Sequence, residues 1–255
     1  MNRICAVCEN TFKESLRQRI LIILLVFALL IIIVSVFLGP FALGEVPKIV
    51  RDVGLSAASF FSILIVIIIG STLIRKDIEK RTIYTVITKP VRRSEIILGK
   101  FSGLLLLIMI IQIMMTIIQQ LVILIFEGAF DPGILLALPF SLLEIMILLG
   151  ILLVFSSFSS PTLSAIMGVV FYIIGHASPD LKLFADQSKI PAMKFIAYGF
   201  YYIMPNLENF NFRLELVHKL PLYADQLMFT VAYGLIYTIF LVYLAILVFE
   251  GREFK

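Results

Sequence analysis

A single carboxylate, Glu144, stands inside one of the long apolar runs of this sequence, Ile134–Phe155. A charge at the centre of a bilayer costs about 2.5–3.5 kcal/mol on insertion scales, so Glu144 must face protein or water, or carry a proton. Ser141 lies one helical turn before it on the same face. Two interpretations follow: a carboxylate that faces a substrate or a proton, or a structural hydrogen bond to a glutamine of a neighbouring helix.

Polar residues also recur at helical spacing in two other apolar runs. One stripe consists of Gln112, Thr116 and Gln119, and the other of Ser164, Gly168 and Tyr172. Such stripes are typical of contacts between membrane helices, which is the first interpretation, and lining of a translocation path is the second. The candidates for path or interhelical contact are Gln112, Thr116, Gln119, Ser141 and Glu144. The candidate hydrogen-bond partners of Glu144 are Gln112, Gln119 and Gln120.

Other groups capable of chemistry are few and scattered. Cys5 and Cys8 form a lone CxxC pair, whereas a structural zinc site needs four ligands, so we interpret them as small apolar residues. Four groups of metal-binding type, His176, Asp180, Glu208 and His218, have a spacing that matches no known site and are interpreted as solvated or interfacial. The sequence contains no G-x-x-x-x-G-K-[ST], HExxH or GxSxG motif, so we expect neither catalysis nor a cofactor on this chain.

Membrane-spanning helices must position these residues. Of the 255 residues, 61% are hydrophobic and 15% are charged, against about 25% charged in a soluble domain. A span needs about 20 apolar residues, and its backbone polar groups must be paired internally, so the spans are helices. Six runs qualify: Ile20–Leu38, Leu55–Ile74, Phe101–Phe126, Ile134–Phe155, Thr162–His176 and Leu227–Phe249. We predict an all-α polytopic membrane protein with one transmembrane domain, residues 1–255.

The basic residues indicate how the chain is oriented. Most of them fall in residues 1–19, in residues 75–100 and near the C-terminus, so the positive-inside rule predicts that both termini are cytoplasmic. Residues 1–19 have apolar residues at every fourth position, which predicts an amphipathic helix in the membrane interface. Residues 178–226 form a long outer region. Within it, the apolar stretch from Pro191 to Pro205 is too short to span and is predicted to be a re-entrant or interfacial helix.

A charged island, DIEKRTIYTVITKPVRRSEIILGK, lies between two apolar runs. Asp77 is a candidate N-cap, Glu79 falls in the first turn, and Pro90 ends the segment, which predicts a short helix across the cytoplasmic ends of two spans. A second helix is predicted to start with Ser94 as its N-cap and to run into the third span. Such a stiff, mixed-charge surface suits docking to another protein. The alternative is a basic loop that only sets topology.

This island resembles the loop between the second and third spans of membrane subunits of the ABC type 2 transporter family. The family pattern is matched by Glu79, Thr82, Pro90, Arg93, Gly99 and Lys100. The resemblance extends over the whole chain, since residues 1–19 look like the family's elbow helix and the six spans and the outer region also fit. Arg81 departs from the pattern, because many members have glycine there.

The resemblance implies a permease subunit of an ATP-binding-cassette transporter in the cytoplasmic (inner) membrane, which exports its substrate or extracts it from the lipid. It implies that residues 75–100 form the coupling region. Its contact residues would be Asp77, Glu79, Arg81, Thr82, Tyr84, Pro90 and Arg93. ATP and Mg²⁺ would be bound by a separate ATP-binding subunit in two copies, beside a second permease chain, identical or different. No nucleic acid partner is implied.

Two other classes of function stay open. An ion- or proton-coupled secondary transporter would use Glu144 as its coupling group. A membrane scaffold would use the helices for assembly alone. A neighbouring gene for an ATP-binding cassette would favour the permease, whereas transport by the purified chain under a proton gradient alone would favour the secondary transporter.

Overall fold

The described part of the computed structural model comprises residues 3–37, 46–74, 92–128 and 130–251, and its regular elements are all helices. They are α1 (Arg3–Leu16), α2 (Arg19–Phe37), α3 (Val46–Thr72), α6 (Arg93–Glu127), α7 (Pro132–Phe158), α8 (Pro161–His176), α9 (Ser178–Gln187), α10 (Pro191–Ile203), the 3-10 turn η2 (Glu208–Phe210), α11 (Arg213–Val217) and α12 (Ala224–Glu250). The predicted all-α class is confirmed.

Four helices, α3, α6, α7 and α12, are long and apolar enough to cross a membrane. Two further pairs pass the same test only when each bent pair is taken as one span. These are α1 with α2, bent by 66°, and α8 with α9, bent by 57°. The chain is therefore a multi-pass membrane protein by length and composition, with four to six spans, and the count of six stays a prediction.

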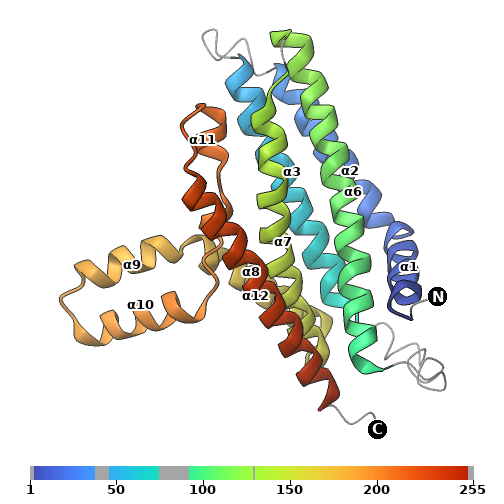
Figure 1. Ribbon diagram of the computed structural model, residues 1–255, viewed down its shortest axis with the longest axis vertical. Coiled ribbons are helices and arrows are strands. Elements are labelled where there is room, and N and C mark those ends of the chain that lie inside the picture. Colours follow the sequence, from blue (N-terminus) through green and yellow to red (C-terminus); the bar gives the residue numbers. More distant parts are fainter. Residues whose placement is uncertain (1–2, 38–45, 75–91, 129, 252–255) are drawn as a thin grey trace.

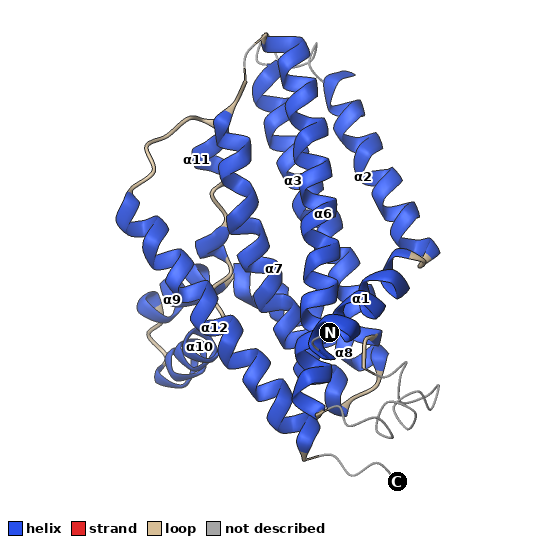
Figure 2. Cartoon of the chain, turned by 45° about the vertical axis from the view of Figure 1, so that its right-hand side comes forward, coloured by secondary structure: helices blue, strands red, loops and turns tan. Residues whose placement is uncertain are grey.

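The long helices run side by side, and the two ends of the bundle are distinct (Figure 1). At one end, which we call the proximal end, helix α6 begins, α12 ends and α1 lies nearby. At the other end, which we call the distal end, α3 begins, α6 ends and α7 begins (Figure 2). The first and last helices thus meet the same end, which agrees with termini on one side of a membrane. Which side that is stays a prediction.

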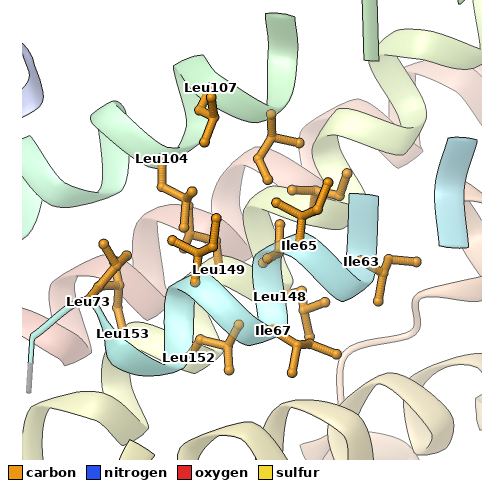
Figure 3. Packing of buried hydrophobic residues seen from close by; sticks show 14 of the residues in the cluster. Ile63, Ile65, Ile67, Leu73, Leu104, Leu107, Leu148, Leu149, Leu152 and Leu153 are labelled. Carbon is orange, nitrogen blue, oxygen red and sulfur yellow. The ribbon is translucent and has the colours of Figure 1, made fainter. Parts of the chain in front are cut away.

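The core forms where α3 meets α6 and α7. Ile65, Leu104, Leu148 and Leu149 are fully buried and interdigitate there (Figure 3). Large apolar side chains on α2 and α12 are instead exposed, among them Ile236, which is 68% exposed. Lipid must solvate such side chains, because water could not do so without a large free-energy cost.

Helix α1 is docked on α6 through two glycines. A Cβ at Gly99 would lie 2.5 Å from the Val7 Cβ, and one at Gly103 would lie 2.6 Å from the Cys8 carbonyl oxygen. Residues of this size let two backbones approach closely. Thr11 and Ser15 of α1 are buried. A helix is therefore present where the amphipathic helix was predicted, and it is packed on α6 and exposed on its other side. Its place in a membrane interface stays a prediction.

Residues 178–226, predicted to form an outer region, contain more helix than the sequence predicted. Helix α10 begins at Pro191 and ends before Pro205, as expected, but α9 before it was not predicted. The Tyr198 hydroxyl donates a hydrogen bond to Asp186, which ties the two helices together. They project sideways at a level between the two ends of α12, rather than at its distal end (Figures 1 and 2). Their position relative to a membrane surface stays a prediction.

Cysteine labelling tests the predicted orientation in a background of Cys5→Ala and Cys8→Ala. Lys219 lies in a groove with Phe130 of the α6–α7 turn at the distal end, and Arg92 is exposed at the proximal end. We expect a membrane-impermeant maleimide applied outside intact cells to label Lys219→Cys and to leave Arg92→Cys unlabelled until the membrane is opened. If only Arg92→Cys is labelled in intact cells, the orientation of the chain is the opposite of the predicted one.

Candidate functional site

A cavity of about 440 Å³ opens inside the bundle, within the range of about 300–1,000 Å³ typical of ligand sites. Helices α3, α6, α7 and α8 form its walls, together with η2 and α11. All five residues predicted to line a path or to join helices border it: Gln112, Thr116, Gln119, Ser141 and Glu144. Its polar wall also includes Tyr172 and His176 of α8 and Arg213 of α11.

Glu144 is bonded to a histidine that lies far from it in the sequence and that also meets a second carboxylate. The His176 Nε2 atom lies 2.9 Å from Glu144 Oε1, and its Nδ1 atom lies 2.8 Å from Glu208 Oε2. Glu208 is fixed in turn by Asn211, whose Nδ2 donates to its Oε1 at 2.9 Å. The Tyr172 ring packs against the imidazole with 4.7 Å between ring centroids. We call Glu144, His176 and Glu208 the carboxylate–imidazole chain.

A glycine at the end of α8 makes this chain of contacts sterically feasible. A Cβ at Gly175 would lie 2.7 Å from Leu207 Cγ and 2.9 Å from the Pro205 carbonyl oxygen. The bare backbone instead accepts a hydrogen bond, from the Leu207 amide to the Gly175 carbonyl at 3.1 Å. This contact seats η2 on the end of α8 and so brings Glu208 to His176.

Counting protons fixes the charge of the carboxylate–imidazole chain. Each of its two nitrogen–oxygen contacts needs one hydrogen. Either the imidazole is doubly protonated between two carboxylates, or one carboxyl group keeps its proton and the imidazole is neutral. Both arrangements carry one net negative charge. The Glu144 side chain is 6% exposed and that of Glu208 is 40% exposed, so the chain extends from the interior of the bundle to its surface.

The three glutamines make other contacts than those predicted. The Ser141 hydroxyl lies 3.2 Å from Gln112 Oε1, which joins α7 to α6. Gln119 donates to the Arg51 carbonyl at 3.1 Å. Gln120, with its amide turned so that both atoms are satisfied, bonds the backbone of Asp131. The prediction that a glutamine holds Glu144 is therefore wrong, because the imidazole of His176 occupies that place.

The remaining candidates of metal-binding type do not converge. Asp180 and His218 are not in the carboxylate–imidazole chain. Cys5 and Cys8 are free thiols on α1. In the part of the chain that the structure describes, no group of three or more histidine, cysteine or acidic side chains could hold a metal ion.

A buried ion pair fastens the distal end. The Arg51 guanidinium of α3 contacts the carboxylate of Asp131, with side-chain exposures of 5% and 9%. Asp131 is also the N-cap of α7, since its carboxylate accepts a hydrogen bond from the Gly133 amide at 2.9 Å. Neither Arg51 nor Asp131 was singled out from the sequence. Nothing in the spacing of residues 51 and 131 signals that they meet.

Two basic residues from the start of α6 fasten the proximal end. The buried Lys100 ammonium donates to the Leu73 carbonyl at the end of α3, at 2.6 Å. The Arg93 guanidinium donates to the Phe249 and Glu250 carbonyls at the end of α12, at 3.2 and 2.8 Å. Positive groups at helix C-termini also stabilise the helix dipole. With the docking of α1 at Gly99 and Gly103, these contacts join α1, the end of α3, the first turns of α6 and the end of α12 into what we call the proximal knot.

Arg93 is the one predicted coupling residue that the structure describes. Asp77, Glu79, Arg81, Thr82, Tyr84 and Pro90 lie outside the described residues. Helix α6 begins at Arg93, with Arg92 as its N-cap and Glu95 accepting from the Arg92 amide at 2.8 Å. The predicted N-cap, Ser94, is wrong by two residues and lies inside the helix.

Comparison with known proteins does not assign the chain to a family. No protein-family model and no curated protein matches the chain at a significant level. Function is therefore inferred from the geometry of the bundle, the cavity and the proximal knot.

Proposed function

We propose that the chain is the permease subunit of an ABC type 2 transporter, driven by ATP that a separate subunit binds and hydrolyses. The observation that carries the proposal is the proximal knot. Lys100 bonds the end of α3, and Arg93 bonds the end of α12. These two basic residues lie in the last part of the charged island, after residues 75–91, and α3 precedes those residues, so both flanks of residues 75–91 are tied to one another.

The knot suits the transmission of force. A docking segment that is moved by an ATPase drives a membrane bundle only if its flanks cannot yield. Here a displacement applied to the island reaches α3 and α6 directly, α12 through Arg93, and α1 through the contacts at Gly99 and Gly103. Two of the helices that wall the cavity, α3 and α6, meet this knot, so a shift of either one against α7 would change the walls.

A second function is favoured by one specific observation. Glu144 lies in contact with a histidine that also meets a second carboxylate. Such a chain can bind and release a proton, as the coupling group of a proton-driven secondary transporter must. On this alternative, Glu144→Gln keeps the shape and hydrogen bonding of the side chain but abolishes transport driven by a proton gradient.

Reconstitution separates the two functions. The cargo that co-purifies with the native complex is identified and offered to vesicles that hold either the chain alone or the chain with its co-purifying ATP-binding subunit. We expect the chain alone to bind no ATP and to move no cargo under a proton gradient, and the complex to move cargo with ATP. Cargo movement by the chain alone, lost in Glu144→Gln, would establish the secondary transporter instead.

A further inference from the structure

We infer that the cavity binds an organic cation of the phenylalkylammonium class, in which an ammonium group is attached to an apolar body that carries an aromatic ring. The ammonium group would lie at Glu144. The inference names a ligand class for the same cavity that the proposed function uses as a path, and it rests on that function only for the onward movement of the ligand. Binding itself requires neither ATP nor a partner subunit.

The charge of the cavity walls selects a cation. The carboxylate–imidazole chain carries one net negative charge in either of its proton arrangements. The guanidinium of Arg213, which also borders the cavity, is offset by Asp52, whose carboxylate lies 3.2 Å away. The charged groups of the walls, taken with Glu208 and Asp52 that adjoin them, therefore carry a net negative charge, and a low-dielectric enclosure strengthens the attraction for a positive ligand.

Acceptor atoms remain available at two points of the cavity. His176 uses one oxygen of Glu144, and within the described residues nothing bonds the other oxygen. The Thr116 side chain is 8% exposed, and its hydroxyl makes no hydrogen bond to any other described residue. A threonine inside a helix ordinarily bonds the carbonyl one turn earlier. An ammonium group supplies up to three donors and fits such acceptors.

Because α6 and α7 run antiparallel, the acceptor atoms of Glu144 and Thr116 lie at different levels of the bundle. Ser141 meets Gln112. Glu144 lies one turn from that contact toward the proximal end, and Thr116 lies one turn from it toward the distal end. At about 1.5 Å of rise per residue the two acceptors are separated by about 10 Å along the bundle. The cationic head therefore belongs at Glu144, and the body of the ligand extends toward Thr116.

The rest of the lining is suited to that body. Phe60, Leu138, Phe210 and Phe212 border the cavity, and the ring of Tyr172 stands beside His176. Aromatic faces attract organic cations in addition to burying apolar surface. A small inorganic cation would leave these walls uncovered, whereas a phenylalkylammonium ion would cover them.

The test compares three probes of one shape on the purified chain in lipid nanodiscs. They are 4-phenylbutylamine, which is cationic, 4-phenylbutanol, which is neutral, and 5-phenylpentanoate, which is anionic; empty nanodiscs correct for partition into lipid. Charge-assisted hydrogen bonds are worth about tenfold to hundredfold in affinity, so we expect the amine to bind that much more tightly than the alcohol, and the anion to bind least. This ranking needs no variant.

Two matched variants then locate the charge. Glu144→Gln should bring the affinities for amine and alcohol to within about twofold. Glu215→Gln should leave the preference intact, because Glu215 borders the neighbouring groove with Arg51 and Asp131 instead of this cavity. Equal binding of amine and alcohol by the parent chain, tightest binding of the anion, or a preference for the amine that survives Glu144→Gln would overturn the inference. None of these results tests whether the chain couples to an ATPase, so the inference can fail while the proposed function stands.

Discussion

Asp131→Asn lowers the free energy of unfolding by about 3–5 kcal/mol, the typical cost of removing one partner from a buried ion pair. Arg51 is 4% exposed and then faces a neutral amide in place of a carboxylate. Asparagine is as good an N-cap as aspartate, so the start of α7 keeps its hydrogen bond and the loss reports the charge. The measurement is reversible unfolding in mixed micelles, followed by helical circular dichroism.

The chain offers a matched control for this result. Asp52 also pairs with an arginine, Arg213, but both side chains are about half exposed, at 53% and 47%. Exposed pairs contribute about 0–1 kcal/mol, so Asp52→Asn should change stability little. Adding Arg51→Met to Asp131→Asn should recover part of the loss, because the buried charge is then gone. Equal effects of Asp131→Asn and Asp52→Asn would show that the Arg51 pair is not buried in the native protein.

Gly103→Leu forces α1 away from α6. A Cβ at this position already lies 2.6 Å from a backbone oxygen of α1 and 2.8 Å from the Thr11 Cβ, so the added side chain has no space unless α1 moves. Overpacking of this kind costs about 1–3 kcal/mol, which corresponds to roughly a 5- to 150-fold increase in the undocked population. Thr11 is 3% exposed and reports the change: maleimide labelling of Thr11→Cys, without the native cysteines, should accelerate by that factor.

Gly199 on α10 serves as the control for this variant. Nothing lies within 4 Å of a Cβ built there, so Gly199→Leu adds the same side chain without a clash and should leave the labelling rate unchanged. An unchanged rate in Gly103→Leu as well would mean that α1 is not docked on α6 through this glycine.

The sequence was sufficient for those features of the fold that depend on local hydropathy. The apolar runs predicted the long helices, and proline bounded α10 as expected. The helix boundary at Arg93 was missed because Ser94 is the better N-cap by propensity, whereas the bonds of Arg93 to the end of α12 favour an earlier start. Tertiary contact overrides such weak local preferences.

The candidate site was predictable only in part, and for a related reason. Hydropathy isolated Glu144 because a carboxylate in an apolar run is conspicuous. Its partners were not found, because His176 and Glu208 each follow at an interval of 32 residues and meet only once α8 and η2 are folded against α7. Arg51 was overlooked because it is not conspicuous: a basic residue at the end of a span is ordinarily a topology determinant.

The proximal knot also gives the lysine and glycine of the charged island a physical role beside the resemblance that first singled them out. Lys100 ends the island in a bond to α3, and Gly99 lies against Val7 of α1. These residues position the flanks of residues 75–91 whatever that segment meets. The proposal that it meets an ATPase is a separate claim and needs its own measurement.

That measurement is the affinity of the chain for its ATP-binding subunit, with and without Tyr84. Because buried aromatic anchors carry most of the affinity at interfaces, Tyr84→Ala should weaken binding by about 2 kcal/mol or more, roughly thirtyfold, and should reduce ATP hydrolysis coupled to transport. Glu79→Ala should cost about 0.3–1 kcal/mol through the helix dipole, and Lys219→Ala, toward the distal end, should have no effect. If Tyr84→Ala and Glu79→Ala both bind and couple like the parent chain, residues 75–100 only set topology, and the permease account is contradicted.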